Sequence, residues 1–259
     1  MSNQPIGIFD SGIGGTSIFK EIKTLLPYEN IIYLADSKNA PYGNKTEEEI
    51  LQLSLKNVKL LLQKNCKLIV VACNTATTNS ITYLRKNYSI PFVGIEPAIK
   101  PASLQSKSKS IGILATKGTL SSTLFHETSD LYAKNVTIIE RVGEGLVPLI
   151  EAGKLNSDEI RELLKTFTKP MIEAQIDYLV LGCTHYPYLI PELKKILPEH
   201  VKIIDSGLAV AKQIKTLLET YNLINTSLNS PKIQFFTNAS VGILDNVLDK
   251  KFSVKPLKF

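Results

Sequence analysis

Short apolar runs separated by segments with helical spacing constrain the fold of this chain more than any other feature. Several runs are apolar throughout rather than alternating, which is typical of strands that helices cover on both faces. Repeated alternation of strand and helix favours an α/β fold with mainly parallel sheets. We predict strands at residues 6–10, 31–36, 68–73, 91–95, 111–116, 136–140, 178–183 and 201–205.

Two of the helical segments begin with clear start signals. Thr46 followed by Glu49 forms a capping box ahead of apolar residues at helical spacing, which predicts a helix over residues 46–65. Ser157 and two acidic residues open a second predicted helix over residues 157–167. The tail after Ser206 carries a further helical pattern and one strand candidate, "KIQFFTN".

An internal repeat divides the chain into two similar α/β units. "IGIFDSGIGG" begins at Ile6 and "IGILATKGT" at Ile111, while Cys73 and Cys183 each end an apolar run. The two offsets are 105 and 110 residues, and a loop accounts for the difference. We place the boundary near residues 96–110, which are rich in Pro, Ser and Lys.

The two repeated cysteines lie where an α/β sheet binds its ligands. Ligands of open α/β sheets bind beyond the carboxyl ends of the strands. If the two units face each other, Cys73 and Cys183 flank one cleft. Polar residues follow Cys73, and His185 follows Cys183 closely enough to activate its thiol. Cys66 is not followed by a comparable run of Asn and Thr or by a histidine, and reads as a small core residue.

Composition limits the classes of protein that remain. Three cysteines in 259 residues do not form a disulfide framework. The sequence has no signal peptide and no apolar stretch of membrane-spanning length, so we expect a cytoplasmic protein without membrane attachment. The net charge of +6 comes from scattered lysines, which argues against nucleic-acid binding and favours small anionic substrates.

Two matched thiols fit stereoinversion better than the other cysteine chemistries. A metal site lacks a CxxC motif, and the three histidines are far apart in sequence. A Cys–His hydrolase leaves the second cysteine unexplained. Inversion of a stereocentre needs one group to remove a proton and another to return it on the opposite face. A thiol with an ordinary pKa of about 8.5 is suited to both tasks.

Two other motifs have both a functional and an ordinary interpretation. "DSGIGGTS", residues 10–17, fits an anion site made of backbone amides, or a tight turn in which Asp10 is a cap. "PYGNKT", residues 41–46, places Tyr42 in a turn before the capped helix, where ordinary turn chemistry is the alternative.

Four motifs in this order resemble the cofactor-independent glutamate racemases of bacteria: "FDSGIGG", "PYGNKT", "VACNTAT" and "GCTHYP". The resemblance implies two α/β domains related by a pseudo-twofold axis, with the active site in the cleft between them. It also implies that the C-terminal segment returns to the first domain. The expected domains are therefore residues 1–97 plus 207–259, and residues 98–206.

The resemblance also assigns residue roles. Cys73 takes the α-proton from D-glutamate and Cys183 takes it from L-glutamate, while Asp10 and His185 assist their respective thiols. Glu151 is the best match to an acidic site residue of the family, with an ordinary surface glutamate as the alternative. The substrate contacts it implies are Asp10, Ser11, Tyr42, Gly43, Asn74, Thr75, Thr184 and His185.

The same resemblance implies an isomerase without cofactor or metal that supplies D-glutamate for peptidoglycan, and hence for cell-wall biogenesis and cell shape. It leaves a homodimer open. Thr77 and Tyr188 depart from the commoner family residues, Ser and Leu. Two alternatives stay open: a racemase for aspartate or another amino acid, and a non-catalytic amino-acid-binding protein.

Overall fold

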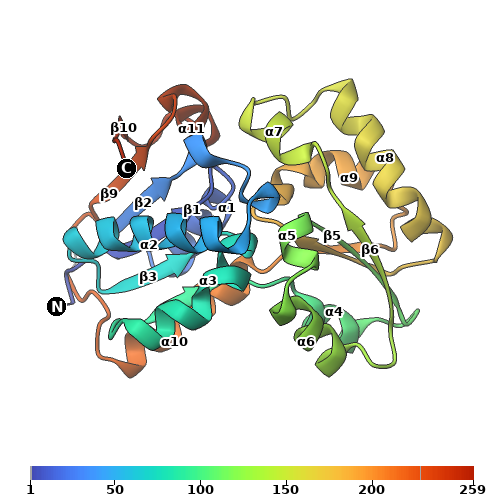
Figure 1. The fold of residues 1–259 in the computed structure, drawn as a ribbon, viewed down its shortest axis with the longest axis horizontal. Coiled ribbons are helices and arrows are strands. Elements are labelled where there is room, and N and C mark those ends of the chain that lie inside the picture. Colours follow the sequence, from blue (N-terminus) through green and yellow to red (C-terminus); the bar gives the residue numbers. More distant parts are fainter. Residues whose placement is uncertain (1, 228) are drawn as a thin grey trace. The chain divides into compact units, whose positions relative to one another are not determined.

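The computed structural model of the chain describes residues 2–227 and 229–259. The chain divides into two compact units. Unit 1 comprises the residues up to Ile95 together with Gly207–Phe259, and unit 2 comprises Glu96–Ser206. Both units are α/β layers around a parallel sheet, so the predicted α/β fold is confirmed (Figure 1).

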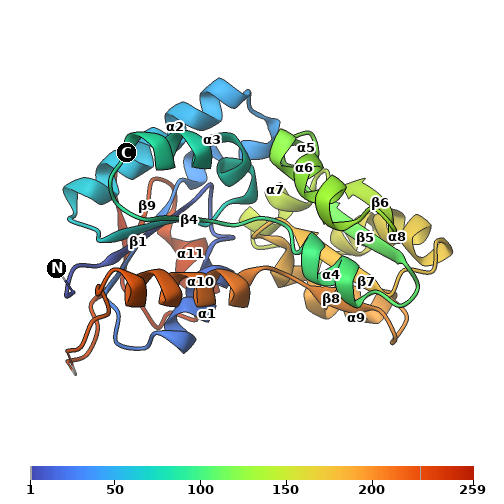
Figure 2. The same ribbon diagram turned by 90° about the horizontal axis from the view of Figure 1, so that it is seen from below.

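Unit 1 is built on a six-stranded sheet in the order β10-β9-β2-β1-β3-β4, and all paired neighbours are parallel. Figure 2 shows helices α2 and α3 on one face of this sheet and α1 and α10 on the other. The strands are β1 (Ile6–Asp10), β2 (Ile31–Ala35), β3 (Leu68–Val71), β4 (Phe92–Gly94), β9 (Ile233–Thr237) and β10 (Val254–Pro256). The helices are α1 (Thr16–Leu25), α2 (Glu47–Gln63), α3 (Asn74–Asn87), α10 (Gly207–Thr220) and α11 (Val241–Val247), with 3-10 turns η1 (Ser37–Asn39) and η2 (Tyr42–Asn44).

Unit 2 has a smaller parallel sheet of four strands in the order β6-β5-β7-β8. Helices α4 and α6 cover one face, and α8 and α9 cover the other (Figure 1). The strands are β5 (Ser110–Ala115), β6 (Thr137–Val142), β7 (Tyr178–Gly182) and β8 (Lys202–Ile204). The helices are α4 (Ile99–Gln105), α5 (Lys117–Leu120), α6 (Thr123–Tyr132), α7 (Leu146–Glu151), α8 (Asp158–Glu173) and α9 (Ile190–Ile196), with the 3-10 turn η3 (Tyr186–Leu189).

The repeat in the sequence corresponds to a repeat in topology. The order β2-β1-β3-β4 in unit 1 matches β6-β5-β7-β8 in unit 2. Gly7 of β1 and Gly112 of β5 occupy equivalent positions, where a helix packs closely on the strand. A Cβ at Gly7 would lie 2.9 Å from Sγ of Cys66, and one at Gly112 would lie 2.7 Å from Sδ of Met171. The repeated Ile-Gly-Ile therefore marks the same packing requirement in both units.

The predicted strands form, but the strands that precede the cysteines end early. β3 ends at Val71 and β7 ends at Gly182, so neither Cys73 nor Cys183 belongs to a strand as predicted. Cys73 instead precedes α3 as its N-cap, because its sulfur accepts a hydrogen bond from the backbone of the first helical turn. The predicted strands were therefore too long by two residues at Cys73 and by one residue at Cys183.

The two helix predictions were right at their starts, but the first ended two residues too late, since α2 ends at Gln63, and the second ended too early. Thr46 caps α2 through the expected capping box, and Ser157 caps α8. α8 continues past the predicted end to Glu173, through Pro170. Its buried positions keep helical spacing as far as Met171, so packing outweighs the cost of about 3 kcal/mol for an interior proline. The proline- and lysine-rich segment 96–110 also contains a helix, α4.

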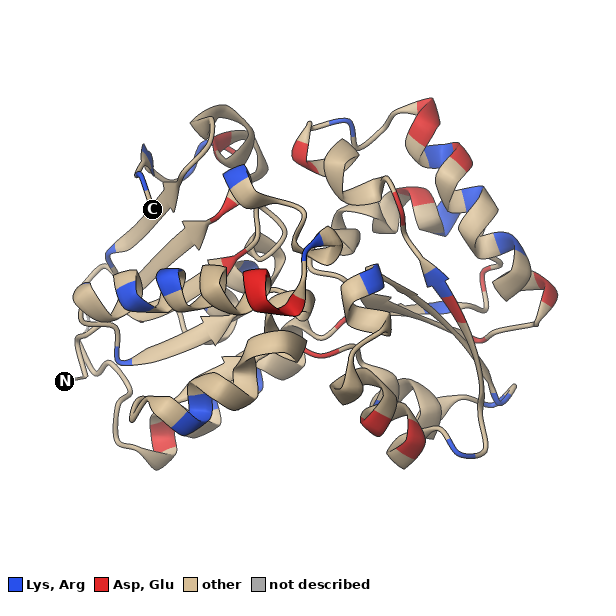
Figure 3. Cartoon of the chain, viewed as in Figure 1, with Lys and Arg blue, Asp and Glu red and all other residues tan. Residues whose placement is uncertain are grey.

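Charged residues are interspersed along the helices. Figure 3 shows acidic and basic residues following each other along α8, for example. Within the part of the chain that the structure describes, no helix is long and apolar enough to span a bilayer.

Candidate functional site

The first candidate cluster lies at the carboxyl ends of β1 and β3, which are paired neighbours. Asp10 ends β1, Ser11 follows it, and Cys73 caps helix α3. The Cys73 sulfur lies 3.5 Å from Oγ of Ser11, to which it donates, and 3.5 Å from the backbone nitrogen of Ala76, from which it accepts. All three predicted residues are buried. A helix N-terminus stabilises negative charge, so this position suits a thiolate.

The glycine-rich turn after β1 holds Asp10 in place. The backbone N–H of Gly12 donates to Oδ2 of Asp10 at 2.9 Å, and the buried phenol of Tyr33 donates to the carbonyl of Gly12 at 3.0 Å. Gly15, not Asp10, is the N-cap of α1. A Cβ at Gly15 would lie 2.8 Å from Cβ of Asp10, so the last glycine of the motif allows the helix to approach the acid.

Asn74 presents an amide that is ready to bind a ligand. It is 3 % exposed, and both its Nδ2 and Oδ1 have no hydrogen-bond partner among the described residues. A buried amide without partners costs free energy, so a bound polar group would satisfy it. Asn74 opens α3 directly after Cys73, and Thr75 is buried beside it. Cys73, Asn74 and Thr75 thus lie together at the N-terminus of α3.

Tyr42 lies in η2 and is almost fully buried. Its phenol donates to Oδ2 of Asp36 at 2.5 Å and accepts from Nδ2 of Asn57 at 3.2 Å. Burial and the neighbouring Asp36 carboxylate raise the pKa of Tyr42 far above its ordinary value. Since its proton is directed at Asp36, the phenol is not a free donor toward a ligand. The adjacent Gly43 has no side chain, so it can contact a ligand only through its backbone.

Sequence reasoning missed Asp36. The signal was present: Asp36 ends the predicted strand 31–36, at the same edge of the sheet as Asp10. Its backbone nitrogen donates to the carbonyl of Asp10 at 3.0 Å, and its side chain is 1 % exposed. A buried acid at a strand's carboxyl end is a candidate functional residue even when no motif contains it.

The second candidate cluster follows β7 in unit 2. Sγ of Cys183 lies 3.8 Å from Nδ1 of His185, and Nε2 of His185 lies 2.6 Å from Oε1 of Glu151. Glu151 ends helix α7, and its side chain is mostly buried. The ordinary alternative, an exposed surface glutamate, is therefore wrong for Glu151. The three side chains form a chain in which the imidazole sits between a thiol and a carboxyl group.

The protonation of His185 follows from these neighbours. Burial is the largest single influence and would lower its pKa. The hydrogen bonds and charges of Cys183 and Glu151 together outweigh burial and raise the pKa of His185 well above its ordinary value. A protonated imidazole at this position stabilises a thiolate on Cys183.

Two further residues flank the second thiol. Thr184 is buried directly after Cys183. Tyr186, which was not predicted, is fully buried, and its phenol donates to the carbonyl of Gly143 at 3.1 Å. Burial and the nearby Cys183 raise the pKa of Tyr186 well above its ordinary value, so it stays a neutral hydrogen-bond donor.

The third thiol differs from the other two. Cys66 is packed against Gly7 of β1, and burial raises the pKa of its thiol to about 12. It stays protonated near neutrality and acts as a core residue, as predicted. All three cysteines are free thiols. Within residues 2–227 and 229–259, no group of His, Cys, Asp and Glu is arranged to hold a metal ion.

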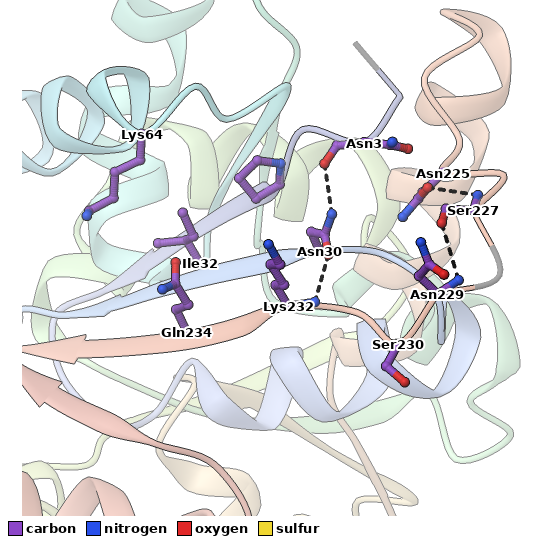
Figure 4. A pocket seen from close by; sticks show the side chains of 11 residues that line it. Asn3, Asn30, Ile32, Lys64, Asn225, Ser227, Asn229, Ser230, Lys232 and Gln234 are labelled. Carbon is purple, nitrogen blue, oxygen red and sulfur yellow. Dashed lines mark hydrogen bonds between the residues drawn. The ribbon is translucent and has the colours of Figure 1, made fainter.

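Unit 1 also contains a pocket of about 440 Å³ far from these groups along the strands. It lies beside residues that precede β1, β2 and β9, at the amino ends of these strands (Figure 4). The amide of Asn30 is already bonded there, to the carbonyl of Asn3 and the backbone nitrogen of Lys232. The described residues that line it include no thiol, acid or histidine, so they offer no group for proton transfer.

The chain has two α/β units with parallel sheets. In each unit a buried thiol follows an equivalent strand and lies beside groups that can hold or release a proton. This arrangement defines a class of α/β proteins equipped for acid–base chemistry with sulfur. The family model of the Asp/Glu/hydantoin racemases matches residues 6–214. The chain belongs to this racemase family.

Curated relatives and solved structures agree with this membership. A glutamate racemase of Herpetosiphon aurantiacus is 43% identical over 92% of this chain and 94% of its own length. The crystal structure of a glutamate racemase isoform from Bacillus anthracis is 32% identical, with a TM-score of 0.90 over 100% of this chain and 98% of the other. The Escherichia coli glutamate racemase, solved with L-glutamate, is 35% identical, with a TM-score of 0.86 over 98% of this chain and 97% of the other.

Proposed function

We propose that this protein is a glutamate racemase that interconverts L- and D-glutamate by a two-thiol mechanism. The observation that carries the proposal is the equivalent placement of Cys73 after β3 and Cys183 after β7 in the two repeated units. Relatives that are 42–44% identical over most of their length and carry the name glutamate racemase support glutamate as the substrate.

In the proposed reaction, one thiolate removes the α-proton and the opposite thiol donates its own proton to the other face of the α-carbon. Cys73 acts as the base toward D-glutamate, and Cys183 acts as the base toward L-glutamate. Each turnover exchanges the protonation states of the two sulfurs, and the reverse reaction restores them. No electrons are gained or lost, so the proposed cycle consumes neither oxidant nor reductant.

The two clusters assist their thiols in different ways. Protonated His185, held by Glu151, stabilises the Cys183 thiolate by charge. The N-terminus of α3 stabilises the Cys73 thiolate, and Ser11 and Asp10 lie at the same strand edge to orient its proton. An α-proton is far less acidic than a thiol, so preorganised donors must stabilise the carbanion-like transition state.

The proposed substrate contacts begin with Asn74. Its unpartnered amide can donate to a carboxylate and accept from an ammonium group. We also propose Ser11, Thr75, Thr184 and His185 as substrate contacts, because they belong to the motifs that carry the family resemblance. Tyr42 and Gly43 contribute mainly through their backbone, because the phenol of Tyr42 donates to Asp36. The product D-glutamate would supply peptidoglycan synthesis in the cytoplasm.

The proposal is tested by incubating the protein with L-glutamate in D₂O without any added cofactor. We expect loss of the circular-dichroism signal and incorporation of deuterium at the α-carbon. L-aspartate serves as the comparison substrate, and faster turnover of aspartate would reassign the specificity. Tight binding of glutamate without exchange of its α-proton would contradict the proposed activity and favour a binding protein.

A further inference from the structure

The 36–44 turn of unit 1 is tied to a distant part of the chain by one side chain, that of Asn238. Asn238 directly follows β9, the strand that the C-terminal segment adds next to β2. Its Nδ2 donates to Oδ1 of Asp36, and its Oδ1 accepts from the backbone nitrogen of Lys38 at 2.9 Å. The same Nδ2 also donates to the carbonyl oxygen of Phe259 at 3.3 Å, so the side-chain nitrogen has two acceptors.

Asp36 passes this connection on toward the candidate site. One of its oxygens accepts from Asn238 and from Nδ2 of Asn39, the latter at 2.7 Å. The other accepts from the phenol of Tyr42 at 2.5 Å. Since Asp36 is 1 % exposed, water cannot replace a lost partner easily. Removal of one donor would leave the buried carboxylate with fewer hydrogen bonds and would fix its orientation less firmly.

We propose that Asn238 is a positioning residue, which fixes the Asp36 carboxylate and through it the Tyr42–Gly43 backbone that lines the substrate site. Among the described residues, Asn238 forms hydrogen bonds with Ala35, Asp36, Lys38 and Phe259, which are neither thiols nor proposed substrate contacts. Its amide satisfies both the Asp36 side chain and the start of the η1 turn, so it sets the path of residues 36–44. This inference rests on the proposed racemase function for its kinetic readout.

The arrangement also explains why an asparagine suits this position. The residue must donate to a carboxylate and accept from a backbone N–H, and a primary amide does both at once. Aspartate has the same shape but only acceptors, and it would place a second negative charge beside Asp36. Alanine would remove both bonds. The two substitutions therefore separate a lost contact from an added repulsion.

The test measures steady-state racemisation of glutamate by Asn238→Ala, Asn238→Asp and the wild type. For Asn238→Ala we expect KM to rise about tenfold, because a hydrogen bond to a buried charged group is lost. We expect kcat to fall less than KM rises, because the thiols are untouched. Asn238→Asp should be more impaired than Asn238→Ala. Asn246→Ala, at an exposed position in α11 of the same segment, should behave as the wild type.

A reciprocal variant tests the pairing itself. Asp36→Asn combined with Asn238→Asp restores one amide and one carboxylate with their positions exchanged. The double variant should reverse much of the increase in KM that Asn238→Asp alone causes. In a Tyr42→Phe background, Asn238→Ala should have a markedly smaller effect, because the link it supports is already broken. Full additivity of these two substitutions would overturn the proposed route.

A readout that does not need activity separates this inference from the proposed function. Hydrogen exchange of the backbone amides of Asn39 and Lys45, which close the two turns, should accelerate in Asn238→Ala and not in Asn246→Ala. An inactive wild type would sink the racemase proposal alone. An active wild type with unchanged KM and unchanged exchange in Asn238→Ala would overturn the positioning role alone.

Discussion

The two units use the same four-strand order but surround their thiols with different chemistry. In unit 1 the Cys73 sulfur is held by a helix N-terminus and a hydroxyl. In unit 2 the Cys183 sulfur faces an imidazole that a carboxyl group holds from behind. A duplicated scaffold thus supplies equivalent positions without supplying equivalent electrostatics. The contacts of the Cys73 sulfur depend on a backbone amide and one hydroxyl, whereas Cys183 lies at the end of a chain of an imidazole and a carboxyl group.

The two units also differ in the burial of β2 and β6, the equivalent strands that pair with β1 and β5. β2 is buried along its whole length because β9 pairs with its outer side. Its counterpart β6 is the outer strand of unit 2 and is largely exposed or half-buried. The C-terminal segment therefore turns an edge strand into an interior strand in one unit only. Asn238, which directly follows β9 in that segment, has no counterpart in the four-strand repeat of unit 2.

The largest expected effect comes from removing either thiol. Cys73→Ser and Cys183→Ser should each lower racemisation by about 10³-fold, because a hydroxyl is a far weaker acid than a thiol and cannot replace it as the base. Circular dichroism of glutamate solutions measures the rate. Cys66→Ser is the matched control and should retain most of the activity. Wild-type turnover in either site variant would break the proposed equivalence of the two units.

Loss of the His185 imidazole should weaken the Cys183 cluster of unit 2 and leave the Cys73 cluster of unit 1 unchanged. His185→Asn should lower kcat by about 10²-fold, since the Cys183 thiolate loses its counter-charge. The conservative variant Glu151→Gln keeps a hydrogen-bonding group but removes the carboxylate, so a smaller decrease is expected. His200→Asn, at an exposed position, is the control. Equal effects of His185→Asn and His200→Asn would show that the ionic chain is not needed.

The same histidine predicts a pH dependence of stability. Its pKa is raised in the folded protein, so the charged form contributes stability that is fully present below the unfolded pKa of about 6.5. That contribution is lost as pH rises through the raised folded pKa. Urea unfolding should therefore give free energies of unfolding for the wild type and His185→Asn that differ by about 3 kcal/mol at pH 6. The difference should be smaller at a pH above the raised pKa of His185. A gap that grows with increasing pH would contradict this assignment.

Equivalent glycines offer a test of the repeat that does not involve activity. Gly7→Ala and Gly112→Ala each insert a methyl group against a packed helix side, within 2.9 Å and 2.7 Å of sulfur atoms. Each should lower the free energy of unfolding by about 1–3 kcal/mol. Gly242→Ala is the control, because Gly242 is exposed and an added Cβ would make no close contact. Gly153→Ala would be a poorer control, because the φ of Gly153 is +74° and disfavours any residue with a Cβ. A neutral effect at one position alone would show that the packing is not shared.

The smallest effect concerns α2 and α8, the helices that precede β3 and β7. Thr46→Ala in α2 and Ser157→Ala in α8 each remove an N-cap and should cost about 1 kcal/mol. Thr46→Ala should cost more, because the Thr46 hydroxyl also donates to Oε2 of Glu49 at 2.9 Å, and this second bond is lost together with the cap. Thermal unfolding of both variants measures the difference. Equal losses would mean that the bond between the Thr46 hydroxyl and the Glu49 carboxylate adds nothing here.

Local sequence patterns predict most of the fold and part of the candidate site. Apolar runs located the strands because both faces of these sheets are covered, and the repeat located both thiols. The pairings that complete the site are different in kind. Asp36 meets Asn238 across 202 residues, and Glu151 meets His185 across 34. No local periodicity encodes such pairs, and only the folded topology brings them together.

The return of the C-terminal segment to unit 1 has a consequence for how the chain is made. Ile31 of β2 pairs with Ile233 of β9, whereas unit 2 is one continuous stretch that leaves the ribosome between them. During synthesis the apolar outer side of β2 therefore waits, without its neighbour, while more than a hundred residues emerge. An uncovered strand edge is a template for pairing with another chain. Truncation before β9 should accordingly yield insoluble protein rather than a merely slower enzyme.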